Sequence, residues 1–158
     1  MTEKLVIYDS VFGNTEIIAK AIGEAIGDAP VKKVSDVSKE DLENIEILFV
    51  GSPTRIFRPT PATSGFLKNL GKESLNGIKA AAFDTRIPLE QTDSEFLRRM
   101  VKFFGYADKK IEKQLRRAGA ELALESEGFG VTGTEGPLIE GELERAKEWA
   151  EGILEKNG

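Results

Sequence analysis

The sequence predicts a single doubly wound α/β domain, in which helices cover both faces of a parallel β-sheet. Segments with strand-like and helix-like patterns alternate along all 158 residues, without an internal repeat or a linker. The strand-like segments are continuous apolar runs, as expected for strands that are buried on both faces. A chain of this length can bury about two thirds of its unfolded surface, so one domain over residues 1–158 is the simplest organisation.

In the first half of the chain, apolar runs alternate with helical patterns from the N-terminus onward. Residues 4–9 form an apolar run that predicts a buried strand, and residues 16–26 repeat apolar side chains at helical spacing. The elements expected next are a short strand at 31–34, a brief helical connection at 39–43, a third strand at 46–50 and a short helix near 64–70.

The second half continues the alternation and ends with an amphipathic helix. Between its two strands lie two successive helical patterns, and the first of these has one strongly apolar side. The expected elements are a strand at 79–83, helices at 94–104 and 108–118, a fifth strand at 121–125 that can resume near 129–131, and a last helix at 142–154.

Composition excludes several classes of function. The chain has no cysteine and no histidine, which removes disulfides, thiolate nucleophiles and the commonest general base and metal ligand. The net charge of −5 and the scattered pairs of Lys and Arg argue against nucleic acid as a partner. No run approaches the ~18 apolar residues of a membrane span, and the N-terminus enters a strand directly. We therefore expect a cytoplasmic protein that binds no nucleic acid, membrane or metal.

The segment from Ser10 to Thr15 is the most informative about function. It is a tight turn between the first strand and the first helix, and it also contains Gly13 and Asn14. Such a turn aims backbone N–H groups and the positive end of a helix dipole at one point, which favours a phosphate. It contains no lysine and matches neither a Walker loop nor a dinucleotide turn. A loop without a cation suits a phosphate monoester held by hydrogen bonds alone.

Two further segments with unusual composition follow the predicted third and fourth strands. Residues 52–63 are rich in Pro and Thr, and Asp84, Thr85 and Arg86 come directly after the fourth strand. In doubly wound sheets, ligands bind outside the carboxyl ends of the strands, where the strand order reverses. The three segments together therefore predict one ligand site.

With these motifs the chain resembles the flavodoxin family. Its segment Tyr-Asp-Ser-Val-Phe-Gly-Asn-Thr-Glu at 8–16 is especially similar to the flavodoxin domains of flavodiiron proteins. The resemblance covers essentially the whole chain, including Gly-Ser-Pro-Thr at 51–54 and the final strand–helix unit. It implies a flavodoxin-like, five-stranded parallel sheet in the order 2-1-3-4-5 that binds FMN, with an extra helical insertion at about 87–105.

The resemblance also implies which residues contact FMN. The first loop would hold the phosphate through Ser10, Asn14, Thr15 and the backbone of 11–15, and the other two loops would bracket the isoalloxazine ring. No residue receives a catalytic role, because the flavin supplies the chemistry. The implied cofactor-binding residues are Ser10, Val11, Phe12, Gly13, Asn14, Thr15, Pro53, Thr54, Arg55, Ile56, Phe57, Asp84, Thr85 and Arg86.

The ring end of the site departs from the family pattern in aromatic residues and in charge. The family commonly stacks a Trp and a Tyr on the ring, whereas the second loop here offers Ile56 and Phe57 and the third offers no aromatic residue. Weaker stacking follows. Arg55, Arg58 and Arg86 bring positive charge to loops that are often acidic, which would raise the reduction potential of the flavin. The alternative is that these arginines point into solvent or bind a partner.

Two questions stay open at this stage, the role of the insertion and the class of activity. The apolar side of 94–104 could add to the core, form a lid over the flavin or make a homodimer contact. The leading hypothesis for function is an FMN-binding electron carrier between transient redox partner proteins, whose acidic net charge suits a basic partner. The alternatives are an FMN-dependent NAD(P)H:quinone-type reductase and a flavodoxin-like interaction module that has lost flavin.

Overall fold

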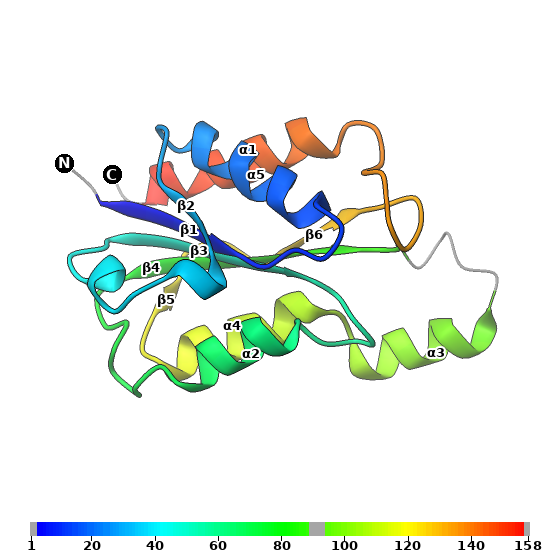
Figure 1. The fold of residues 1–158 in the computed structure, drawn as a ribbon, viewed down its shortest axis with the longest axis horizontal. Coiled ribbons are helices and arrows are strands. Elements are labelled where there is room, and N and C mark those ends of the chain that lie inside the picture. Colours follow the sequence, from blue (N-terminus) through cyan, green and yellow to red (C-terminus); the bar gives the residue numbers. More distant parts are fainter. Residues whose placement is uncertain (1–2, 89–93, 157–158) are drawn as a thin grey trace.

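The computed structural model describes residues 3–88 and 94–156, which form three layers (Figure 1). A parallel sheet is the middle layer, and helices cover both of its faces, as the sequence predicts. One face is covered by α1 (Asn14–Ala25) and α5 (Glu142–Lys156), and the other by α2 (Pro61–Lys68) and α4 (Ala107–Arg117).

The order of the strands is β2-β1-β3-β4-β5, with every pairing parallel. The expected order is therefore confirmed. The fifth position is shared by two short strands, because β5 pairs with the start of β4 and β6 pairs with its end. The strands are β1 (Lys4–Tyr8), β2 (Val31–Lys33), β3 (Ile47–Pro53), β4 (Lys79–Arg86), β5 (Glu121–Leu122) and β6 (Glu127–Gly130).

Two hydrophobic clusters, one on each face of the sheet, hold the layers together. The central strands contribute to both, since their side chains alternate between the two faces and are buried on each. In the cluster beneath α1 and α5, Trp149 packs edge-on against Phe49 and Phe129, with ring centroids 5.4 and 5.9 Å apart. This rigid core fixes the carboxyl ends of β1, β3 and β4 relative to one another.

Strands β3 and β4 run further than the sequence indicates, β3 to Pro53 and β4 to Arg86. Asp84, Thr85 and Arg86 were expected in a loop, but they are the last residues of β4. Their backbone is paired on both sides, for example Asp84 with Ser52 of β3 and with Gly128 of β6. The expectation of a loop was wrong because these three side chains are polar, as in loops. Their backbone is nevertheless in a strand, because two neighbouring strands pair with it.

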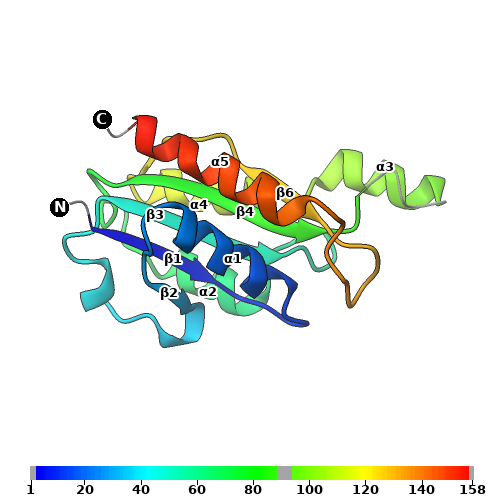
Figure 2. The same ribbon diagram turned by 90° about the horizontal axis from the view of Figure 1, so that it is seen from above.

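Helix α3 (Glu95–Phe104) forms the described part of the helical insertion, and residues 89–93 lie outside the described residues. It extends beyond the carboxyl end of the sheet, on the side of α2 and α4 (Figures 1 and 2). None of its residues is buried, and Phe96 and Phe103 are 68% and 81% exposed. The interpretation of this helix as additional core is therefore wrong.

The connection between β2 and β3 contains two short 3₁₀ helices, η1 (Val34–Asp36) and η2 (Glu40–Leu42). The second of them lies within the helical connection expected at 39–43. No helix in the described part of the chain is long and apolar enough to cross a membrane.

Candidate functional site

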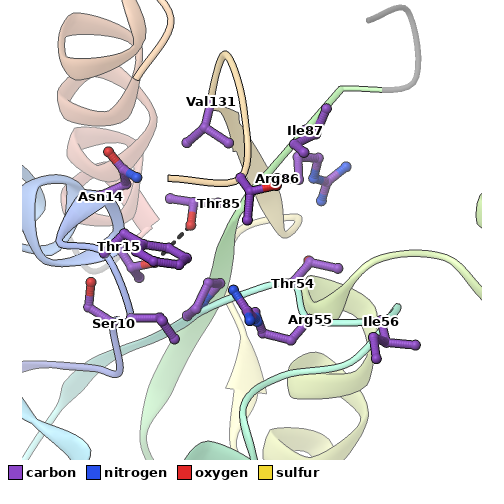
Figure 3. Close-up of a pocket in the computed structure, with 14 residues that line it drawn as sticks. Ser10, Asn14, Thr15, Thr54, Arg55, Ile56, Thr85, Arg86, Ile87 and Val131 are labelled. Atoms are coloured by element: carbon purple, nitrogen blue, oxygen red, sulfur yellow. Dashed lines mark hydrogen bonds between the residues drawn. The ribbon is translucent and has the colours of Figure 1, made fainter. Parts of the chain in front are cut away.

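The carboxyl ends of β1, β3 and β4 surround a cavity of about 240 Å³ (Figure 3). None of the residues that line it is acidic, which favours an anionic ligand. Gly13, Phe57 and Asp84 belong to the predicted site but are not among the lining residues. The cavity is lined by Ser10, Val11, Phe12, Asn14, Thr15, Pro53, Thr54, Arg55, Ile56, Thr85, Arg86, Ile87, Val131 and Thr134.

The turn between β1 and α1 forms the polar end of this cavity. Gly13 caps α1 in the left-handed conformation, with a φ of 97° that glycine adopts without strain. Within the described residues, the backbone N–H groups of Asn14, Thr15 and Glu16 have no acceptor, so they can bind an anion. The Ser10 hydroxyl accepts a hydrogen bond from the Gly13 N–H at 3.0 Å and keeps its own proton for a ligand.

The first and third predicted segments are joined by a pair of buried hydroxyl groups. The Oγ1 atoms of Thr15 and Thr85 lie 2.8 Å apart, so one hydroxyl donates to the other. The hydroxyl that accepts still has a proton to donate. The pair can therefore offer one hydrogen bond to a ligand. Thr85 thus joins Thr15 at the polar end of the cavity, whereas the resemblance placed it beside the ring.

The first and second segments are joined by Asp9, which the sequence analysis did not single out. Its carboxylate accepts hydrogen bonds from the Ser10 N–H at 2.9 Å and from the Thr60 hydroxyl at 2.5 Å. Thr60 also caps the N-terminus of α2 by accepting from the Thr63 N–H. Asp9 thus holds the start of the anion-binding turn against the end of the second loop.

A fourth segment, between β6 and α5, closes the cavity and was also missed. Val131 and Thr134 line the cavity, and the Asn14 side chain donates to the Glu135 carbonyl at 3.1 Å. Gly136 has a φ of 100°, and a Cβ there would lie 2.6 Å from the Asn14 side chain. The Gly-Thr-Glu-Gly-Pro run at 133–137 was the signal that could have identified this loop.

The second loop contains a tight hairpin turn with unusual backbone geometry. The N–H of Arg55 donates to the Arg58 carbonyl at 2.7 Å, and that of Arg58 donates to the Arg55 carbonyl at 3.1 Å. Ile56 and Phe57 both have positive φ, of 49° and 65°, in a turn that usually requires Asn-Gly. Ile56 lines the cavity, whereas Phe57 turns away and stacks on Phe104 at 5.7 Å.

Arg86 lies at the edge of the cavity, but its charge is balanced by two carboxylates. Its Nε and Nη2 donate to Asp84 at 2.7 and 2.6 Å, and Nη2 lies 3.2 Å from Asp108. Its guanidinium also lies 3.7 Å from the centroid of the Tyr106 ring. Asp84 is fully buried in this network and therefore does not face the cavity.

The positive charge expected at the ring end is consequently smaller than the sequence indicates. Arg58 lines a separate cavity between α2 and α4. Arg55 remains at the main cavity, 5.6 Å from the centroid of the Phe12 ring, and it forms no ion pair within the described residues. Arg55 is thus the arginine that can act on the reduction potential of a bound flavin without a balancing carboxylate.

Comparison with known proteins identifies the family. The family model for flavodoxin matches residues 6–149 of the chain. The chain belongs to the flavodoxin family. Flavodoxin family proteins bind FMN and carry out electron transfer.

Solved structures of flavodoxins and of a flavodiiron core share the fold over nearly the whole chain. A flavodoxin from the domain Archaea is 21% identical, covers 98% of each chain and has a TM-score of 0.73. Flavodoxin 2 from Bacillus cereus is 24% identical, with 98% of this chain and 99% of that chain covered and a TM-score of 0.73. The Flv1 flavodiiron core from Synechocystis is 19% identical, with 99% of this chain and 37% of that chain covered and a TM-score of 0.68.

The cavity of this flavodoxin family member fits FMN at both ends. The free amides of the first turn of α1, the Ser10 proton and the Thr15–Thr85 pair match the oxygens of a phosphate monoester. Ile56 and Val131 offer apolar contacts to a flat ring. Within the described residues there is no cluster of acidic side chains that could hold a metal instead.

We expect the stability of this flavodoxin fold to depend on pH through Asp84. Burial raises the pKa of Asp84 from its ordinary value of 3.8 to about 6, although Arg86 opposes this shift. Between these values the folded protein holds a proton that the unfolded chain has lost. The stabilisation that comes from this extra proton is therefore full below pH 4 and is lost as the pH rises through 6, while the ionised Asp84 that remains still pairs with Arg86.

Urea unfolding of the wild type and Asp84→Asn at two pH values measures this effect. Relative to Asp84→Asn, the wild type should lose about 2 kcal/mol of unfolding free energy between about pH 4.5 and about pH 7. A difference between the two proteins that stays constant, or grows with pH, would contradict the assignment.

Proposed function

We propose that this flavodoxin family member carries electrons between transient redox partner proteins by means of bound FMN. The observation that carries the proposal is the set of unpaired donors at the start of α1, which faces a carboxylate-free cavity that also has apolar lining residues such as Ile56 and Val131. The lining residues include no general base or nucleophilic cysteine, so their part is to bind and orient the cofactor, while FMN supplies the electron chemistry when bound. The cytoplasmic location expected from the sequence is part of this proposal.

The test is titration of the purified chain with FMN, followed by measurement of electron transfer. Quenching of FMN fluorescence should show one binding site, and binding of riboflavin should be weaker because it lacks the phosphate. The FMN-loaded protein, once reduced with dithionite, should reduce a one-electron protein acceptor but should not oxidise NAD(P)H. A chain that binds no FMN would be an interaction module without flavin. Rapid oxidation of NAD(P)H with a quinone would indicate a reductase.

A further inference from the structure

A second cavity, of about 320 Å³, lies between α2 and α4 and is strongly basic. Its charged lining residues are Arg58, Lys68, Lys110 and Lys113, and no carboxylate is among the lining residues. Within residues 3–88 and 94–156, the side chains of Arg58, Lys68 and Lys113 form no ion pair or hydrogen bond. Burial and the nearby Arg58 charge lower the pKa of Lys110, as expected where positive charges are not balanced.

This basic cavity is connected to the FMN cavity by the hairpin turn of the second loop. Arg58 ends the turn, while Arg55 and Ile56 of the same turn line the FMN cavity. Lys110 supports the turn from α4, because its ammonium donates to the carbonyl of Phe57. Unpaired positive charge therefore lies beside the cavity in which FMN would bind.

Helix α3 extends this surface and adds apolar side chains to it. Figure 1 shows α3 beyond the end of α4, on the same side of the sheet. Phe96, Leu97 and Phe103 are exposed, whereas three basic residues and one acidic residue lie together on another side of the helix, namely Arg98, Arg99, Lys102 and Glu95. Phe104 stacks on Phe57 and its carbonyl accepts a hydrogen bond from Lys110 at 2.7 Å, so α3 is attached to the second loop. Exposed apolar groups with charged residues around them are typical of protein docking surfaces.

We propose that this surface docks a redox protein whose own docking surface is acidic around an apolar centre. The surface, called here the basic face, consists of Arg55, Arg58, Lys68, Lys110, Lys113 and helix α3. The proposal rests on the electron-transfer function proposed above, for which it specifies the chemistry of the partner.

The net charge of −5 suggests the opposite choice, a basic partner, but net charge averages over all faces of the molecule. Charges on a surface act over a Debye length of about 8–10 Å at physiological salt, so the local charge decides which partner docks. Exposed carboxylates of this chain, such as Glu144, Glu148 and Glu151, lie on α5, which covers the opposite face of the sheet (Figure 1). The two faces thus present opposite charges, and the basic one adjoins the FMN cavity.

The test compares two haem proteins of opposite surface charge, the acidic cytochrome b5 and the basic cytochrome c. Stopped-flow rates of their reduction by the FMN-loaded, reduced protein are measured at increasing salt. The rate with cytochrome b5 should fall at least about 10-fold between about 10 mM and about 300 mM salt, whereas the rate with cytochrome c should rise or stay constant. Calorimetric binding of oxidised cytochrome b5 to the flavin-free protein gives a second readout, which stays informative if FMN binding fails.

Charge reversal locates the effect on the basic face. Lys68→Glu/Lys113→Glu should lower the low-salt rate and the affinity with cytochrome b5 at least about 10-fold, with FMN affinity unchanged. The matched control is Lys33→Glu/Lys39→Glu, which makes the same charge change at exposed residues in and after β2 and should alter either quantity less than about 2-fold. Phe96→Ser/Phe103→Ser tests the apolar part and should mainly speed dissociation of the complex.

Several outcomes would overturn the proposal. The protein could reduce cytochrome c faster than cytochrome b5 at low salt, or the two charge-reversal variants could have equal effects. It could also bind an RNA oligonucleotide tightly in place of cytochrome b5, or sediment as a homodimer that buries α3. Loss of FMN binding in the wild type with intact binding of cytochrome b5 would instead reject the proposed function and leave the docking face in place.

Discussion

Replacement of Ser10 by aspartate should lower the affinity for FMN at least about 100-fold without unfolding the protein. The Ser10 hydroxyl already accepts from the Gly13 N–H, so a carboxylate at this position lies beside the unpaired amides of α1 and takes the place of the phosphate. Repulsion and the loss of charge-assisted hydrogen bonds together amount to about 3 kcal/mol, which corresponds to about 100-fold in affinity. Titration of FMN fluorescence measures this loss.

Two controls separate a phosphate effect from general damage. Ser10→Ala removes one hydrogen bond without adding charge and should cost about 10-fold in FMN affinity. Riboflavin has no phosphate, so its affinity should be nearly the same for the wild type and Ser10→Asp. Helix α1 tolerates a carboxylate at its N-terminus, and the thermal midpoint should therefore not fall. Equal losses for FMN and riboflavin would show that the phosphate does not bind at this turn.

The polar end of the site was predictable because its chemistry is local in the sequence. The strand, the turn at Ser10–Thr15 and the helix are contiguous in the sequence. The N–H groups at the N-terminus of a helix can bind an anion without help from distant parts of the chain. The fold was predictable for a similar reason, since continuous apolar runs and intervening helices determine a parallel sheet. Its strand order required the resemblance to flavodoxins and is confirmed by the observed pairing.

The ring end was less predictable because its charges are paired across the fold. The sequence shows Arg86 as one of three cations, but its partner Asp108 and its ring contact Tyr106 lie beyond an insertion. Phe57 is likewise directed away from the cavity by Phe104, at the end of α3. Such contacts depend on where an inserted helix attaches, which neither periodicity nor composition indicates. The loop at 131–138 closes the cavity for the same non-local reason, through Asn14 and Glu135.

Truncation of Asp84 to alanine should destabilise the protein by about 3–5 kcal/mol at neutral pH, because it leaves the largely buried Arg86 without its main partner. The Arg86 side chain is only 20% exposed, so water cannot replace the two hydrogen bonds that it donates to Asp84. Urea unfolding monitored by the fluorescence of Trp149 measures the loss. A cost below about 1 kcal/mol would mean that Arg86 leaves the network freely.

The double variant Asp84→Ala/Arg86→Met distinguishes an unpaired charge from a simple loss of packing. Removal of both charges should recover more than half of the lost stability, because a buried ion pair contributes little beyond what an apolar replacement provides. A cavity effect would instead make the double variant at least as unstable as Asp84→Ala. The FMN site offers an independent check, since Arg86 also lines the adjoining cavity and Asp84 no longer balances its charge in Asp84→Ala. The reduction potential of the FMN-loaded protein should then rise in Asp84→Ala and return toward the wild-type value in the double variant, because Asp84 and Asp108 keep the charge of Arg86 balanced in the wild type.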